Sequence, residues 1–402
     1  MSPDRRVRRT WLRAAGAVCL AAAVRAAPCP AADTGLEASL GVRAEYNDNV
    51  AFTRTDARDD LLAVVSPAVR WRYAGERYTL RPSLSADLWK YADRTELDDF
   101  QWFAGLDCAQ AFTERLQGNA SASYREDTTL ETELEETGIV RRREDRFRFV
   151  LGTGVSYLAT ERSRAEISYR YSDTAFATAA NEDYTSHAVT AAYTRSLNPR
   201  GDVLTLQPSY VRYDSTSSEV DNFGFTVGYT RHATETLTGR AAAGVRYTRV
   251  DQRRAFLFGP VLVVVDAEDS NWGFVADLAL EYRGERTTAT AGYSQDLIYS
   301  SDGEPFDRRR LYLNGTFRLT RRLVAGLGTD WNWTRSEAAG NVTGDSRYYR
   351  VGPYLSYRWT ENQDLSVRYD YSYDKDEDAG GDEVATRNRV WVLWTLRYPF
   401  RS

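Results

Sequence analysis

The chain has 402 residues, of which 42% are hydrophobic and 27% charged, and its formal net charge is −5. This negative charge argues against nucleic acid as a partner, because nucleic-acid binding needs an excess of basic side chains. The mean hydropathy of −0.54 and the lack of a long apolar run exclude a bundle of membrane-spanning helices. Composition alone would suit a large soluble protein, so the class of the protein must come from the pattern of its residues.

Residues 1–32 have the composition of a removable signal peptide. An arginine-rich start leads into an apolar stretch from Ala14 to Val24, and small residues continue to Ala32. The apolar stretch is too short to cross a bilayer as a helix. We expect cleavage after Ala26 or Ala32, between which the sequence does not decide. The mature domain then covers residues 33–402, has a formal net charge of about −10, and keeps one cysteine, so no disulfide framework is expected.

From Leu36 to the C-terminus the chain repeats one unit about eighteen times, an alternating apolar and polar run of about ten residues. In the first unit the apolar residues share one face of a strand: Leu36, Ala38, Leu40, Val42, Ala44 and Tyr46. The last unit repeats the pattern between Arg389 and Tyr398. Such runs are about twice as long as the strands of soluble sandwiches. One face therefore suits lipid and the other suits water.

The connections between these units alternate between tight turns and long polar loops. We find eight tight turns, and nine long loops near residues 47–60, 92–98, 126–143, 172–183, 214–221, 248–271, 300–307, 335–345 and 374–385. The sequence does not decide whether the loop near 248–271 extends as an outer hairpin through residues 255–265. Two-sided membrane topology produces this alternation, because the turns on one side stay short while the loops on the other are free to grow. Seventeen connections join eighteen strands. Both termini then fall on the short-turn, periplasmic side.

The sequence therefore predicts an all-β protein, a transmembrane antiparallel up-and-down β-barrel of about eighteen strands. A count of about 16 to 20 strands is compatible with the pattern. Its aromatic residues, 26 Tyr, 10 Trp and 15 Phe, gather near strand ends, where amphipathic rings suit the lipid headgroups. We expect one domain in the outer membrane of a Gram-negative envelope. Its expected partners are outer-membrane lipid and lipopolysaccharide.

The polar face of the strands supplies the candidate residues of a lumen. Each of these alternates with an apolar neighbour: Arg43, Arg70, Arg72, Arg81, Asp87, Asp107, Arg146, Arg148, Glu166, Arg170, Arg318, Asp330, Arg368 and Asp370. Their mixed signs predict a polar channel wall with internal ion pairs. These residues do not identify the solute.

The third long loop carries opposed charges and is a candidate constriction. General porins fold their third loop into the lumen, where acidic and basic groups create a transverse field. The candidate residues here are Glu131, Glu133, Glu135, Glu136, Arg141, Arg142 and Arg143. A freely exposed loop is the alternative.

Residues for catalysis are sparse. His187 has Asp183 and Ser186 close in sequence, which is a weak indication of a hydrolase at the barrel rim. An acidic loop near residues 374–383 could hold Ca²⁺ or bridge lipopolysaccharide, although a solvated loop is the simpler interpretation. The chain lacks a phosphate loop, zinc-ligand spacing and a dinucleotide fingerprint. We therefore expect that the protein has no cofactor and is not an enzyme.

The start of the mature chain resembles the opening of a family of outer-membrane barrels called β-barrel porin 2. The resemblance rests on Glu45-Tyr46-Asn47-Asp48-Asn49-Val50, Asp59-Asp60 and Val65-Ser66-Pro67-Ala68-Val69, which cover the first hairpin. Members of that family are often encoded with exopolysaccharide or capsule synthesis machinery. The resemblance implies a role in passing polysaccharide or smaller solutes, with polysaccharide export components as partners.

One departure from the usual barrel pattern concerns assembly. Barrel proteins usually end on an aromatic residue, but here Phe400 is followed by Arg401 and Ser402. We still expect the barrel-assembly machinery to bind the last strand.

The predicted function is a porin-like conduit for exopolysaccharide export or for small polar solutes, because barrels of sixteen to eighteen strands leave an aqueous channel. The alternative is a plugged structural or surface-binding barrel associated with envelope polysaccharide.

Overall fold

The computed structural model describes residues 33–130, 134, 137–138, 143–178, 181–199, 201–258, 261–299, 305–336, 345–378 and 381–401. The predicted signal peptide lies outside the described residues. So do six of the seven candidate constriction residues, Glu131, Glu133, Glu135, Glu136, Arg141 and Arg142.

Eighteen strands make up almost all of the described chain. They are β1 (Asp33–Asn47), β2 (Asp60–Ala74), β3 (Tyr78–Tyr91), β4 (Asp99–Ala111), β5 (Leu116–Thr128), β6 (Asp145–Thr160), β7 (Ser163–Phe176), β8 (Tyr184–Ser196), β9 (Val203–Ser215), β10 (Ser218–His232), β11 (Leu237–Phe258), β12 (Val261–Arg283), β13 (Thr287–Tyr299), β14 (Pro305–Arg318), β15 (Leu323–Ser336), β16 (Asp345–Arg358), β17 (Gln363–Asp378) and β18 (Gly381–Arg401). A short 3₁₀ helix, η1 (Thr95–Leu97), lies between β3 and β4.

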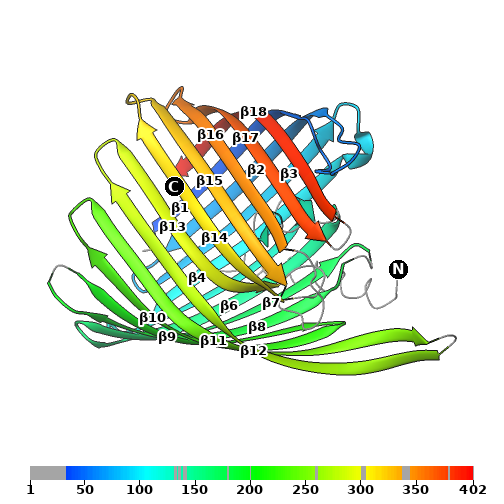
Figure 1. Cartoon of the computed structure of the whole chain (residues 1–402). Coiled ribbons are helices and arrows are strands. Elements are labelled where there is room, and N and C mark those ends of the chain that lie inside the picture. Colours follow the sequence, from blue (N-terminus) through cyan, green and yellow to red (C-terminus); the bar gives the residue numbers. More distant parts are fainter. Residues whose placement is uncertain are drawn as a thin grey trace.

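The strands form a closed antiparallel barrel (Figure 1). Each strand pairs with its neighbours in the chain, and β1 also pairs with β18 from Gly35 opposite Arg401 to Asn47 opposite Arg389. Closure gives every strand a neighbour on both sides, so backbone N–H and C=O groups can bond within the wall wherever neighbouring strands are in register. The predicted fold class and the predicted number of strands are confirmed.

The outer face of the barrel carries the exposed apolar residues. Leu36, Val42 and Tyr46 on β1 are each about 40% exposed. The same alternation runs round the wall, and on β12 it exposes Trp272, Phe274, Leu278, Leu280 and Tyr282. A continuous apolar surface of this kind is suited to lipid. Among the described residues, no helix has both the length and the apolar character needed to cross a membrane.

Three of the predicted long loops are shorter than expected. In the predicted loop over residues 248–271, β11 continues to Phe258 and β12 begins at Val261. The loops predicted near 214–221 and 374–385 are likewise mostly strand, because β9 ends at Ser215 and β17 ends at Asp378. Backbone pairing continues beyond the stretches in which apolar and polar residues alternate, and those stretches were the signal for the strands. Figure 1 shows the β11–β12 hairpin projecting beyond its neighbours.

The assignment of faces can be tested at two adjacent residues of β8. Val189 lies on the outer face in register with Tyr169 and Tyr210, and the next residue, Thr190, lies on the inner face. Replacing Val189 with Arg should lower the free energy of unfolding by about 2–4 kcal/mol, because the charge faces hydrocarbon. Thr190→Arg should leave it nearly unchanged.

The measurement is urea unfolding in lipid vesicles, followed by tryptophan fluorescence, with Val189→Leu as the size control. Equal destabilisation by the two arginines would contradict the assignment.

Candidate functional site

The inner face of the barrel wall is the candidate functional site. It carries the residues that alternate with the exposed apolar ones. The register places all fourteen predicted lumen residues on this face: Arg43 on β1, Arg70 and Arg72 on β2, Arg81 and Asp87 on β3, Asp107 on β4, Arg146 and Arg148 on β6, Glu166 and Arg170 on β7, Arg318 on β14, Asp330 on β15, and Arg368 and Asp370 on β17.

Charged residues of the inner face pair with carboxylates on neighbouring strands. Arg146 on β6 binds both carboxylate oxygens of Asp127 on β5, at 3.0 and 3.1 Å, and both side chains are buried. Arg310 on β14 donates from two guanidinium nitrogens to a single carboxylate oxygen of Asp330 on β15. A bidentate pair such as Arg146–Asp127 needs the planar guanidinium of arginine. The sequence pointed to Arg146 and Asp330 but missed both of their partners.

Three arginines surround one tryptophan on the wall formed by β17, β18 and β1, and we call this group the arginine–tryptophan cluster. The guanidinium carbons of Arg368 and Arg389 each lie 5.3 Å from the centre of the Trp391 ring, and that of Arg43 lies 5.7 Å away. Asp370 is fully buried and lies 3.0 Å from Arg368 and 3.6 Å from Arg389. Such distances allow cation–π attraction between the guanidinium groups and the ring.

Two further charged residues belong to the same cluster. Arg350 lies 2.9 Å from Asp370, and Glu45 lies 3.5 Å from Arg43. Within the described residues of the cluster, four guanidinium groups face two carboxylates. Arg389 and Trp391 stand at polar-face positions of β18, so the alternation of that strand was the signal that could have identified them.

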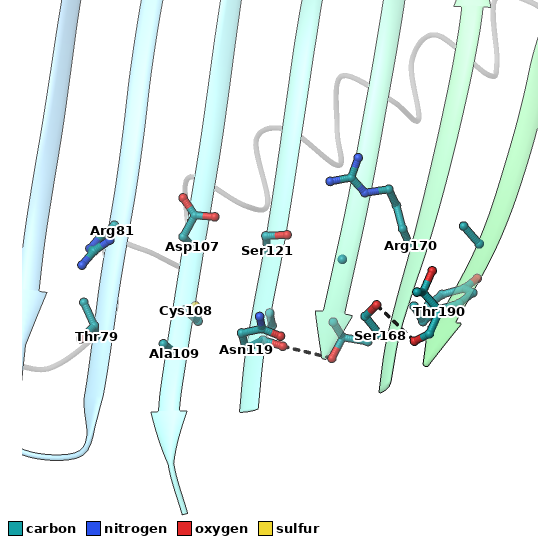
Figure 2. Close-up of a pocket in the computed structure, with 15 residues that line it drawn as sticks. Thr79, Arg81, Asp107, Cys108, Ala109, Asn119, Ser121, Ser168, Arg170 and Thr190 are labelled. Carbon is teal, nitrogen blue, oxygen red and sulfur yellow. Dashed lines mark hydrogen bonds between the residues drawn. The ribbon is translucent and has the colours of Figure 1, made fainter. Parts of the chain in front are cut away.

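A second part of the wall is lined by small side chains. A hollow of about 560 Å³ lies along the strands from β3 to β8. Figure 2 shows Arg81, Asp107 and Arg170 in one tier of this hollow, with Ala109, Asn119 and Ser168 nearer the strand ends. Arginine and aspartate in a hollow of this size suit water and polar solutes better than an apolar ligand.

The third long loop, residues 129–144, is called loop 3, and its described residues reach across the lumen. Leu134 is fully buried and packs in one cluster with Tyr348 on β16 and Phe52. Gly138 has a φ of +75°, and a Cβ atom there would lie 3.0 Å from Cβ of Asn332 on β15. Loop 3 connects β5 and β6, so its contacts with β15 and β16 lie on a part of the wall that is distant from its own strands. Arg143, the candidate constriction residue that is described, instead approaches Leu97 and Asp99.

The first long loop, residues 48–59, also enters the lumen, and we call it loop 1. The Asn49 side chain donates to the carbonyl oxygens of Thr53 and Thr386, at 2.8 and 3.0 Å. The carboxylate of Asp48 accepts from the backbone and the side chain of Asn388, at 2.7 and 2.6 Å. The Asn47-Asp48-Asn49 motif therefore fastens loop 1 to β18.

Apolar contacts also hold loop 1 against the barrel wall. Val50 packs against Leu62, Val64, Trp89 and Tyr91 on the inner face of β2 and β3. This apolar cluster lies on the inner face and fills space near the long-loop end of the barrel.

Arg54 of loop 1 is surrounded by carboxylates of β17 and β18. It pairs with Asp376 and Glu383 and lies 3.7 Å from Asp374. Asp374 follows Tyr373, the last outward-facing tyrosine of β17, and therefore lies beyond the lipid-facing segment. Burial raises the pKa of Asp374 from its ordinary value of 3.8 to about 7, and the nearby Asp376 carboxylate adds to this rise.

This shift predicts that loop 1 is held less firmly as the pH rises. Seated loop 1 keeps Asp374 protonated up to about pH 7, whereas a solvated Asp374 loses its proton near pH 4. The seated state therefore binds more protons between these values and loses stability as the pH increases. Asp374→Asn should remove this dependence.

The mobility of a nitroxide on Thr55→Cys, measured by EPR in a Cys108→Ser background, should rise between about pH 4 and 7. Asp330→Asn, which lies away from loop 1, serves as the control. A mobility profile that Asp374→Asn leaves unchanged would contradict the assignment.

The side chains of His187, Ser186 and Asp183, which the hydrolase alternative requires, do not come together. The His187 ring faces outward, where Nδ1 lies 2.8 Å from the Tyr169 hydroxyl, whereas Ser186 points to the inner face. Asp183 accepts a hydrogen bond from the backbone of Phe176 instead. Within the described part of the chain, no three His, Cys, Asp or Glu side chains gather in an arrangement that could hold a metal ion.

Comparisons with known proteins identify the fold. No protein-family model matches the chain, and neither does any curated protein. The chain is similar to the unliganded ferric citrate transporter FecA, with a TM-score of 0.52 and 10% identity over 92% of this chain and 79% of that one. Two further structures are the closed form of the receptor Fiu from E. coli K12, with a TM-score of 0.49 and 11% identity over 91% and 82% of the chains, and OccK2 of Pseudomonas aeruginosa, with 0.48 and 11% over 91% and 98%.

At such low identity the likeness to FecA shows the fold alone. That fold is the outer-membrane β-barrel, in agreement with the apolar outer face. The resemblance to the β-barrel porin 2 family stays a prediction.

Proposed function

We propose that this protein is a conduit for polar solutes across the outer membrane, with both termini in the periplasm. The observation that carries the proposal is the polar inner wall of an eighteen-stranded barrel. Barrels of this size leave an aqueous channel unless a loop fills it. A wall of arginine–carboxylate pairs keeps such a channel hydrated.

Anionic saccharides are the solute class that this lumen suits best. Guanidinium groups bind carboxylates and sulfates through paired hydrogen bonds, and aromatic faces stack on sugar rings. The arginine–tryptophan cluster places both kinds of group on one part of the wall. The resemblance of the first hairpin to a family encoded with exopolysaccharide machinery supports export of an anionic polysaccharide.

Loops 1 and 3 would close this conduit in its resting state. Loop 3 is held by Leu134, and loop 1 by Val50 and the Asn47-Asp48-Asn49 motif. Apolar contacts suit a reversible closure, because separating them leaves no buried hydrogen-bonding group without a partner.

Removing the anchor of loop 3 should open the conduit. Leu134→Asp places a carboxylate in an apolar cluster, and a cost of about 3 kcal/mol would change the ratio of closed to open states by about a hundredfold. The measurement is single-channel recording in planar bilayers, with Leu134→Met as the conservative control. Gly138→Val offers a second route to the same release, because a branched side chain fits neither its φ nor the space beside Asn332.

The same recording decides between the conduit and a second candidate, a permanently plugged barrel. The apolar clusters inside the lumen favour that candidate. Silent bilayers for the wild type and for both loop 3 variants would favour the plug and contradict the conduit.

The saccharide class can be tested by blocking the open channel. An oligogalacturonate should reduce the current of Leu134→Asp more strongly than a neutral malto-oligosaccharide of equal length. Adding Arg43→Gln should weaken the block by about tenfold or more, because one charge-assisted hydrogen bond is lost. Arg318→Gln, near the short-turn end, is the matched charge control. Equal block by the charged and neutral oligomers would contradict a preference for anions.

A further inference from the structure

The wall has one incomplete seam, between β12 and β13. These strands are in register only from Ala276 opposite Gln295 to Arg283 opposite Thr288. On its other side β12 pairs with β11 along its whole length, from Val261 to Tyr282. Within the described residues, β12 therefore has no registered partner on β13 from position 275 towards its long-loop end.

This seam reaches into the lipid-facing band. The outward apolar residues of β12 run from Trp272 to Tyr282. A ten-residue strand rising about 3.3 Å per residue and tilted by about 40° spans about 25 Å, which is the height of the apolar band in such barrels. Residues 272–275 therefore lie at the depth of the outer leaflet without pairing to β13.

Beyond the seam, β13 and β14 bend inward behind the wall. The Tyr299 ring of β13 stacks on Tyr213 of β9, with centres 4.3 Å apart. Asp307 of β14 lies 3.7 Å from Arg246 of β11, whose guanidinium occupies the space beside Gly273. These partners are three or four strands apart around the barrel. The ends of β13 and β14 therefore overlap the inner face of β9 to β12.

An apolar patch lies directly inside this overlap, and we call it the lumenal aromatic patch. Tyr213, Val220 and Val250 are buried there, with Tyr184 and Tyr299 packed against them. Like the apolar clusters around Val50 and Leu134, the patch interrupts an inner face that carries many charged and hydroxyl groups. Its side chains suit a hydrocarbon chain.

An unpaired strand edge at bilayer depth is tolerated only where protein buries it or a cavity adjoins it. From this constraint and the overlap, we propose that the β12–β13 seam is a lateral passage between the lumen and the outer leaflet. Its ligand is an acyl-chain amphiphile, whose chain crosses the seam onto the lumenal aromatic patch while its polar head stays in the lumen. The Arg246–Asp307 pair holds the passage closed.

The test uses vesicles that contain a phospholipid with a photoreactive diazirine in its acyl chain. After irradiation, the modified residues are mapped by mass spectrometry. Wild-type protein should carry adducts on Tyr213, Val250 or Tyr299, which meet inside the overlap. Asp307→Asn should increase these adducts by about tenfold, because it removes the charge that holds the overlap.

Two further variants complete the test. Asp277 lies in the part of β12 that pairs with β13, and its carboxylate is 3.2 Å from the guanidinium group of Arg240 on β11. Asp277→Asn breaks this ion pair and should leave the adducts unchanged. Arg246→Cys with Asp307→Cys, joined by a short bis-maleimide in a Cys108→Ser background, should abolish the lumenal adducts.

Adducts confined to outward residues such as Phe274 in every variant would overturn the passage, and so would lumenal adducts that survive the cross-link. The cross-linked protein tests the proposal even if Asp307→Asn does not fold. Conductance is not the readout here, so failure of this experiment leaves the conduit standing.

Discussion

Hydrocarbon offers no hydrogen bonds to a peptide group, and this constraint organises the whole molecule. Each strand meets it by pairing with its two neighbours, and β1 completes the cylinder by pairing with β18 over thirteen positions. Once the ladder is closed, successive side chains must point alternately to lipid and to the lumen. The apolar outer surface and the charged inner wall are therefore two aspects of one backbone requirement.

Much of the fold could be predicted because its determinants are local. Alternation along each strand identifies its lipid face, and the rhythm of tight turns and long loops gives the number of strands. The same alternation placed Arg43, Arg368 and Asp370 on the inner wall. Those predictions needed only residues close together in the chain.

The remaining features depend on contacts between distant segments, so they could not be read from local patterns. Leu134 packs on Tyr348 because loop 3 crosses the lumen, and nothing near Leu134 in the sequence indicates that partner. The stack of Tyr299 on Tyr213 arises because β13 leaves the wall, and its alternation gives no sign of that bend. Arg389 and Trp391 gain their significance from residues on β1 and β17.

The attachment of loop 1 has a consequence for biogenesis. Asn49 and Asp48 come from the first connection of the barrel, yet they bond to Thr386 and Asn388 on its final strand. These partners do not come together until the cylinder has been completed. The segment that is synthesised early must therefore wait for the last strand, and its docking marks a finished molecule. In a chain truncated before β18, loop 1 would lack these bonding partners. The docked motif therefore distinguishes a completed barrel from an incomplete one.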